Sequence, residues 1–566
     1  MTTASNLFED RLSLLESRLE NLTASVDHRF KVINHNNDVF FVMSMGTIIF
    51  LMQCGFAFLE AGSVRSKNAT NILIKNMLDP CFSAAAYWIC GWAFAFGTPS
   101  NPFIGYGEFC SAWMPRTKYH SWYFQFVFAA TASTIVSGAV AERCEFIAYV
   151  VYCSMLTGFI YPLVTHWAWA EDGWLKNLGG KGFGYQDFAG SGVVHLLGGT
   201  CALIGAVFLG PRIGRYKSRH SLYEHELRGH SVPFAALGGF VLLFGFFAFN
   251  GGSQASISKE GDGESVAQAV LNTILSGAFA AFTTLLLAKL KYQKWSLLIT
   301  LNGALAGMVA ICASCNTIHP WSAAIIGCVS GPAFTFWSFL IQKLKVDDPL
   351  DAFAVHFGGG LWGVLATPIF DIKDGIIFYW DRQAFLGFAW NVAGAAVIIL
   401  WSSVFSIIMF SLLRLTNSLR VSEENEIKGL DIVKHGEPAY PLTSYGHGWG
   451  PPWDEAINWT VLALKKAGKL EMADSPRAAE EALQTVSQEI MRSPMGAVFE
   501  HPEIDWLQNH RTPQQQMYPM QPNGSATSSG RRRNRQNAVS PVNLEPIPYP
   551  NFYQYLPQPY QYRNSY

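Results

Sequence analysis

Two histidines lie inside apolar, glycine-rich segments: His195 in DFAGSGVVHLLGG and His356 in DPLDAFAVHFGGG. An imidazole can donate and accept hydrogen bonds and can gain a proton near neutral pH. Inside a membrane span such a ring is costly, so it normally faces a pathway or a polar partner. Two of them, each preceded by an aspartate, indicate two halves of the chain that meet at one site. The alternative is two separate core histidines, each bonded to a backbone carbonyl.

The composition is that of a membrane protein. Half of the 566 residues are hydrophobic and 14% are charged, against about 25% in typical soluble proteins. The formal net charge of −1 argues against a nucleic-acid partner. Cys312 and Cys315 form a CxxC, but no second CxxC or histidine set completes a metal site. We therefore expect no metal, no cofactor and, without a nucleophile–base pair, no enzyme.

Eleven segments are long and apolar enough to cross a membrane, which predicts an all-α, polytopic protein with its termini on opposite sides. Lysine and arginine are more frequent in the loops of one side, which is therefore expected to be cytoplasmic. This orientation places the N-terminus outside the cell and the C-terminus inside, in what we expect to be the plasma membrane. The spans are expected to begin near Val39, Cys81, Trp122, Phe146, Asp187, Val232, Val266, Trp295, Trp321, Asp351 and Ala384.

This topology predicts the depth of both histidines. The fifth span enters from outside near Asp187 and the tenth enters from inside near Asp348. At about 1.5 Å of rise per residue, each ring lies about 12 Å into a core of about 30 Å. We expect the two rings to lie near the midplane and within reach of each other.

The N-terminal residues 1–38 form a separate extracellular segment with a periodic apolar stripe. Its members, which alternate at spacings of three and four, are Leu12, Leu15, Leu19, Leu22 and Val26. The stripe predicts either an amphipathic helix packed on the outer surface or a short coiled coil that joins subunits. Asn21 starts a glycosylation sequon and points away from the stripe.

The chain is expected to leave the membrane after residues 39–413, the transmembrane domain. Residues 414–507 form a cytoplasmic segment with short amphipathic helices at 454–470 and 476–492. Residues 508–566 are rich in Gln, Pro, Asn, Ser and Tyr. Such a composition cannot bury a core, which predicts a disordered tail.

Several segments, in order, resemble the ammonium transporter family (Amt type). They are GFAFLEAGSVRSKN (55–68), FAATASTIVSGAVAER (128–143), DFAGSGVVH (187–195), FGFFAFNGGS (244–253), DDPLDAFAVHFGG (347–359) and GLDIVKHGEPAY (429–440). The resemblance covers about residues 39–440. It implies an inverted five-plus-five repeat followed by an eleventh helix, assembly as a homotrimer in the lipid bilayer, and transport of ammonium or ammonia.

The resemblance also implies the site. An outer recruitment site corresponds to Phe128, Trp169 and Ser253, where a ring face attracts ammonium and a hydroxyl accepts one N–H. A gate of two phenylalanines corresponds to Phe128 and Phe249. Below the gate, His195 and His356 line a pore in which neutral ammonia avoids the desolvation cost of the ion.

Two aspartates receive different interpretations. Asp187 corresponds to the family's indispensable aspartate and is expected to stabilise the incoming cation, with a helix N-cap as the alternative or additional role. Because eight residues separate it from His195, both are expected on one side of a helix. Asp351 is about 140° around the helix from His356 and is expected to make a structural bond instead.

Two other functions stay open: an ammonium sensor with the same fold, and a gas channel like the Rh proteins. Residues 429–440 resemble the family's regulatory segment, in which Gly429 forms the docking turn. Val433 stands where many plant relatives have a phosphorylated threonine.

Overall fold

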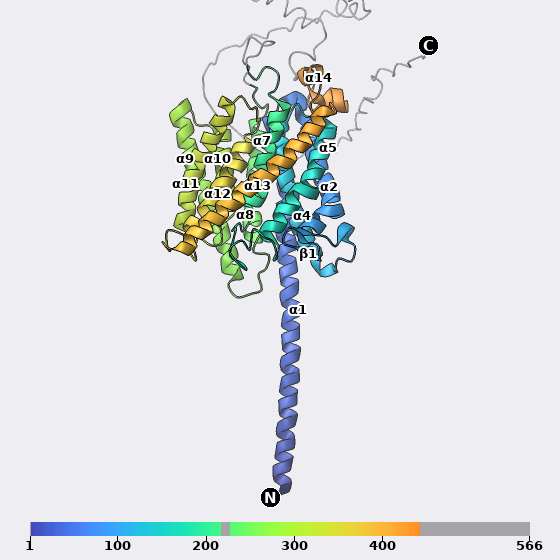
Figure 1. The fold of residues 1–566 in the computed structure, drawn as a ribbon, viewed down its shortest axis with the longest axis vertical. Helices are drawn as coiled ribbons and strands as arrows, with labels where there is room; N and C mark the ends of the chain where they lie inside the picture. Colours follow the sequence, from blue (N-terminus) through green and yellow to red (C-terminus); the bar gives the residue numbers. More distant parts are fainter. Residues whose placement is uncertain (1, 217–226, 442–566) are drawn as a thin grey trace, which may run out of the picture. The chain divides into compact units, whose positions relative to one another are not determined.

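The computed structural model describes residues 2–216 and 227–441 (Figure 1). Helices form almost all of their regular structure, and β1 (Ser100–Asn101) and β2 (Ile104–Gly105) form one short antiparallel pair. The α-helices are α1 (Thr2–Ser63), α2 (Ala69–Ala86), α3 (Trp92–Phe96), α4 (Tyr119–Val140), α5 (Phe146–Met155), α6 (Tyr161–Trp169), α7 (Leu197–Leu209), α8 (Val232–Gly252), α9 (Asp262–Tyr292), α10 (Leu297–Ile311), α11 (Pro320–Lys343), α12 (Gly359–Phe370), α13 (Arg382–Leu415) and α14 (Glu423–Lys428).

Short 3-10 and π-helical turns complete the helices. The 3-10 turns are Ser66–Asn68, Phe109–Ser111 and Arg116–Lys118. Five π-helical turns occur at Tyr87–Gly91, Leu156–Ile160, Ser191–Leu196, Phe353–Gly358 and Asp431–His435. The first four of these interrupt or begin long apolar helices.

Within the described residues, nine helical stretches are long and apolar enough to cross a membrane. This finding confirms the prediction of an all-α, polytopic membrane protein. Two further predicted spans fall short of these limits. The helix α10 has only 15 residues, and the stretch from α2 to α3 contains the charged, buried residues Lys75 and Asp79.

Several predicted helix starts agree with the structure, and two differ for physical reasons. Phe146 and Val232 begin α5 and α8 as predicted. The second helix begins at Ala69, well before the predicted Cys81. The prediction was late because Lys75 and Asp79 lower the hydropathy of the first turns. In the structure both side chains are buried and hydrogen-bonded. The fifth begins at Ser191 instead of Asp187.

The two ends of the helical bundle carry different elements. The first part of α1 and the β1–β2 pair lie at one end, which we call the β1 end, and α14 lies at the other (Figure 1). The helix α1 enters at the β1 end and α13 ends beside α14. The described chain therefore begins and ends its bundle on opposite sides, as the odd number of predicted spans requires.

A buried ion cluster joins the loops at the α14 end. The Glu142 carboxylate accepts from Arg65 Nε at 2.6 Å and lies 3.3 Å from Arg212 Nη1. Arg212 also donates to both carboxylate oxygens of Asp347, at 2.8 and 3.1 Å. Breaking such a buried pair leaves an uncompensated charge, so the cluster fixes four connections between helices relative to one another.

The N-terminal segment differs from the expectation. Residues 2–63 form one uninterrupted helix, so the segment 1–38 is not separate from the first span. Residues 10–37 are exposed along their whole length, so this part of the helix packs against no other described residues of the chain. The predicted helices at 454–470 and 476–492 and the tail 508–566 lie outside the described residues.

Candidate functional site

The two histidines meet inside the bundle. His195 lies on the π-helical turn Ser191–Leu196 and His356 on the turn Phe353–Gly358. Their Nδ1 atoms are 3.1 Å apart and their rings are stacked at 5.2 Å between centroids. One Nδ1 must carry the proton that the other accepts. The prediction that the rings lie within reach is confirmed, and the alternative of two separate core histidines is wrong.

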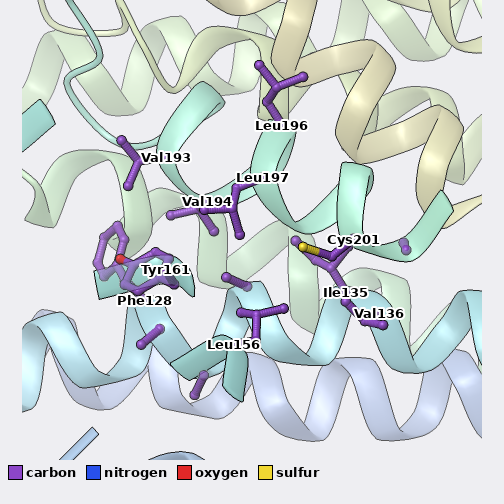
Figure 2. Close-up of a cluster of buried hydrophobic side chains, with 14 of the residues drawn as sticks. Phe128, Ile135, Val136, Leu156, Tyr161, Val193, Val194, Leu196, Leu197 and Cys201 are labelled. Carbon is purple, nitrogen blue, oxygen red and sulfur yellow. The ribbon is translucent and has the colours of Figure 1, made fainter. Parts of the chain in front are cut away.

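Glycines allow the two histidine-bearing segments to cross at close range. A Cβ on Gly199 would lie 2.3 Å from the backbone nitrogen of Phe357, and one on Gly360 would lie 2.4 Å from the carbonyl oxygen of Ser191. Small residues at such a crossing bring the backbones together. On the opposite side, Val194 and Leu197 point toward α4, which carries Phe128 and Ile135 (Figure 2).

Two phenylalanines stack next to the histidine pair. The rings of Phe128 and Phe249 are 4.1 Å apart between centroids and stacked, and both side chains are buried. Phe249 is also 5.5 Å from the ring of His195, and Phe246 packs at 5.7 Å from the same ring. The aromatic pair therefore lies directly between the histidines and the β1 end of the bundle.

A hollow of about 260 Å³ lies on the other side of this aromatic pair. Trp169 stands edge-on to Phe128 with 5.9 Å between centroids. Ser253 Oγ donates to the carbonyl of Phe249 at 2.8 Å, so its oxygen lone pairs remain able to accept. The residues that line the hollow are Val42, His120, Ser121, Phe124, Gln125, Phe128, Trp169, Phe188, Ser253 and Ala255. Aromatic faces and a hydroxyl acceptor suit a small cation that donates hydrogen bonds.

The carboxylate of Asp187 faces backbone amides. Its oxygens accept from the amides of Gly190, Gly192 and Val193 at 2.8–2.9 Å. The Tyr185 hydroxyl donates to the same carboxylate at 3.2 Å. Asp187 thus caps the π-helical turn that carries His195. The expectation that Asp187 and His195 lie on one helix is wrong. Gly190 adopts a left-handed φ of 98°, and the helix begins only after it, at Ser191.

Asp187 has a counterpart that the sequence interpretation missed. Asp348 Oδ2 accepts from the amide of Phe353, five residues on, at 2.7 Å, and thereby caps the turn that carries His356. Asp187 accepts from Gly192 across the same interval of five residues. Asp351 accepts a bond from Ser338 Oγ at 2.8 Å, in line with the structural bond expected of it. The sequence feature that could have indicated this role of Asp348 is its position in the run DDPLD, directly before the turn that carries His356.

A cavity of about 30 Å³ lies on the α14 side of the histidines. It is lined by His356, Thr134, Asn302 and Glu60 among mostly apolar side chains. Glu60 is buried, and its carboxylate accepts from the Asn76 amide at 2.6 Å and from the Ser137 hydroxyl. Sequence reasoning missed Glu60, although an acidic residue within the apolar run GFAFLEAG is an unusual signal.

The segment after α14 docks on α2 of the same chain. Gly429 has a φ of 97°, and a Cβ there would lie 2.6 Å from the Lys67 side chain. The amide of Leu430 donates to Asn68 Oδ1, and Asp431 Oδ1 accepts from the amide of Asn71. Gly429 therefore forms a turn that a larger residue would strain.

No group of three metal-ligating side chains occurs among residues 2–216 and 227–441. The hollow, the aromatic pair, the histidine pair and the second cavity instead follow one another from the β1 end toward the α14 end. This arrangement suits passage of a small solute better than a covalent reaction.

Comparison with known proteins agrees with this arrangement. The model of the Ammonium Transporter Family matches residues 39–440. The chain is 49% identical over 451 residues to "Putative ammonium transporter 1" of Caenorhabditis elegans, covering 76% of this chain and 84% of that protein. It is 40% identical over 405 residues to "Ammonium transporter 1 member 2" of Oryza sativa, covering 67% and 81%.

Solved structures share the fold. The "Sensor Amt Protein" superposes with a TM-score of 0.66 at 35% identity, over 72% of this chain and all of that one. Candida albicans Mep2 superposes with a TM-score of 0.62 at 25% identity, over 74% of this chain and 93% of that one. By its sequence, from the first span to the docked segment after α14, this chain belongs to the ammonium transporter family.

Proposed function

We propose that this protein takes up ammonium in the hollow at the β1 end and conducts ammonia past the histidine pair. The observation that carries the proposal is the uninterrupted order of hollow, stacked phenylalanines, paired histidines and second cavity. Trp169 and Phe128 attract the cation by their ring faces, and Ser253 accepts one of its N–H groups. Potassium cannot donate such a bond, which gives selectivity a basis.

The apolar constriction favours ammonium that has given its proton to solvent water in the hollow and continues as ammonia. An ion that passed between Phe128 and Phe249 would shed its hydration without replacement, whereas neutral ammonia loses far less. Beyond the gate, the imidazoles of His195 and His356 exchange hydrogen bonds with ammonia and share one proton between their Nδ1 atoms. Asp187 supports this path by holding the turn that carries His195.

The finer architecture belongs to the same proposal. Counting α10 and the stretch from α2 to α3 gives eleven crossings. The matched caps Asp187 and Asp348 before matched π-helical turns support an inverted five-plus-five repeat followed by α13. The chain then forms a homotrimer in the plasma membrane, with the N-terminus outside and the segment 429–440 in the cytoplasm, where it regulates transport.

Uptake by cells that lack ammonium transport tests the proposal. Wild type should restore uptake, and His195→Ala and Trp169→Ala should lower it at equal surface expression. Trp167→Phe is the matched control, because Trp167 packs against Trp174 and donates to the Phe103 carbonyl, away from the hollow. Wild-type protein at the surface without uptake would refute transport and favour the sensor.

A further inference from the structure

The first part of α1 leaves an apolar stripe uncovered on a rigid helix. Leu15, Leu19 and Leu22 are each more than 60% exposed, and Leu12 and Val26 are 46% and 40% exposed. In proteins, most of the stability of a helix comes from packing of its apolar face and not from helix propensity. A helix of this length with a continuous leucine stripe therefore needs a partner for that stripe.

Among residues 2–216 and 227–441, no other part of the chain covers the stripe, and the bilayer cannot cover it. The first glycine of the sequence is Gly46 and the first proline is Pro80, so α1 has no hinge at which it could fold back. Asp38 fixes the point of exit, because its carboxylate accepts from the amides of Ile257 and Ser258 at 2.8 and 3.1 Å. The charged residues between the leucines exclude burial in lipid.

The stripe fits the seam of a parallel coiled coil. In a heptad written a to g, Leu12, Leu19 and Val26 occupy a positions, and Leu15 and Leu22 occupy d positions. Phe8 extends the d positions toward the N-terminus, while Arg29 ends them. The seam from Phe8 to Val26 is about 28 Å long at about 1.5 Å per residue.

Charges flanking the seam select a copy of the same helix in the same direction. Arg11 falls at a g position and Glu16 at the following e position. In a parallel, in-register pair, the g residue of one helix meets the next e residue of its neighbour, so Arg11 faces Glu16 of the other copy. An antiparallel pair would instead place arginine against arginine at g. Copies inserted in one membrane necessarily present their helices in parallel.

We infer that residues 8–26 of α1 form a parallel coiled coil with the same segment of the other subunits of one assembly. The inference rests on the homotrimer proposed above and is independent of transport. Asn21 falls at a c position, outside the seam, so a glycan there is compatible with the coiled coil. The bundle is then tied to its neighbours at two levels, through the membrane domains and through the stalk beyond the β1 end.

Disulfide trapping in native membranes tests the contact in the full-length chain. Leu15→Cys places thiols at a d position, where facing Cα atoms come close enough for a disulfide. Ser17→Cys, at an f position on the opposite face, is the matched control and carries the same native cysteines. Oxidation should convert most of the Leu15→Cys chain to covalent dimer and leave Ser17→Cys monomeric on a denaturing gel. Equal trapping at both positions, or none at position 15, would overturn the inference.

A charge swap provides the second test. Arg11→Glu and Glu16→Arg should each lower the temperature at which the detergent-solubilised assembly dissociates, and the double variant should restore it, because the pair re-forms with reversed signs. Additive losses in the double variant would contradict the parallel register. Uptake is measured in every variant. Trapping without wild-type uptake would refute transport alone, and uptake without trapping would refute the coiled coil alone.

Discussion

Replacing Asp187 by asparagine separates its structural role from a role in binding the cation. Its carboxylate accepts three backbone N–H groups at 2.8–2.9 Å in a buried site. An asparagine offers one acceptor oxygen, which can serve the two N–H groups of Gly192 and Val193 but not that of Gly190. One buried N–H left unsatisfied costs about 1–3 kcal/mol. The two remaining bonds also lose the strength of a charged acceptor, about 1 kcal/mol each.

The expected destabilisation of Asp187→Asn is therefore about 3–5 kcal/mol, measured as the loss of thermal stability of the purified protein in detergent. Tyr185→Phe is the matched control, because it removes only the bond of 3.2 Å to the same carboxylate and should cost about 1 kcal/mol. Uptake should fall in step with stability. An Asp187→Asn protein with wild-type stability but no uptake would refute the capping argument and assign the carboxylate to the cation.

Three further predictions concern the gate, the ion cluster and the sequon. Phe249→Ala removes the ring beside His195, so water should reach the histidines and proton leak into proteoliposomes should rise, as read by an internal pH dye; an unchanged leak would argue against a gate. Burial raises the pKa of Asp347, but hydrogen bonds and charge from Arg212 outweigh it and lower the pKa from 3.8 to about 2. This carboxylate therefore contributes about 2 kcal/mol to the free energy of unfolding above about pH 4, and the contribution is lost as the pH falls toward 2. Asp347→Asn should therefore reduce the loss of stability measured between about pH 4 and pH 2. An unchanged loss in that range would count against the Asp347–Arg212 pair. Asn21 is exposed on α1, so a glycosidase should shift the wild-type band from a glycosylating host but not that of Asn21→Gln; no shift in wild type would exclude the modification.

The meeting of the two histidines was predictable from the sequence because it depends only on span order and the rise of a helix. Apolar length located most helices to within a few residues. It failed where polar groups are buried with partners. The start of α2 was missed because Lys75 and Asp79 lower the mean hydropathy of that segment. A hydropathy value takes no account of the hydrogen-bond partners that allow such a charged side chain to be buried.

The caps formed by Asp187 and Asp348 and the cavity beside His356 could not be predicted from the sequence. Asp187 and Asp348 bond to amides several residues away across a left-handed glycine or an irregular turn, which periodicity does not describe. Glu60 and Asn76 come from neighbouring helices, α1 and α2, and their hydrogen bond forms only because those helices pack together. The continuity of α1 could have been recognised, because no glycine or proline separates residues 1–38 from the first span.

The wide turns beneath the two histidines make chain length as important there as side-chain identity. A π-helical turn holds one residue more than the α-helical turn it replaces, and both His195 and His356 lie within such turns. Removing a single residue from either turn would rewind it to a regular helix and rotate the preceding residues by about 100°. A deletion that leaves both imidazoles in the sequence would thus turn one of them away from the other. At these two places a change of residue count should therefore be as damaging to transport as the loss of an imidazole.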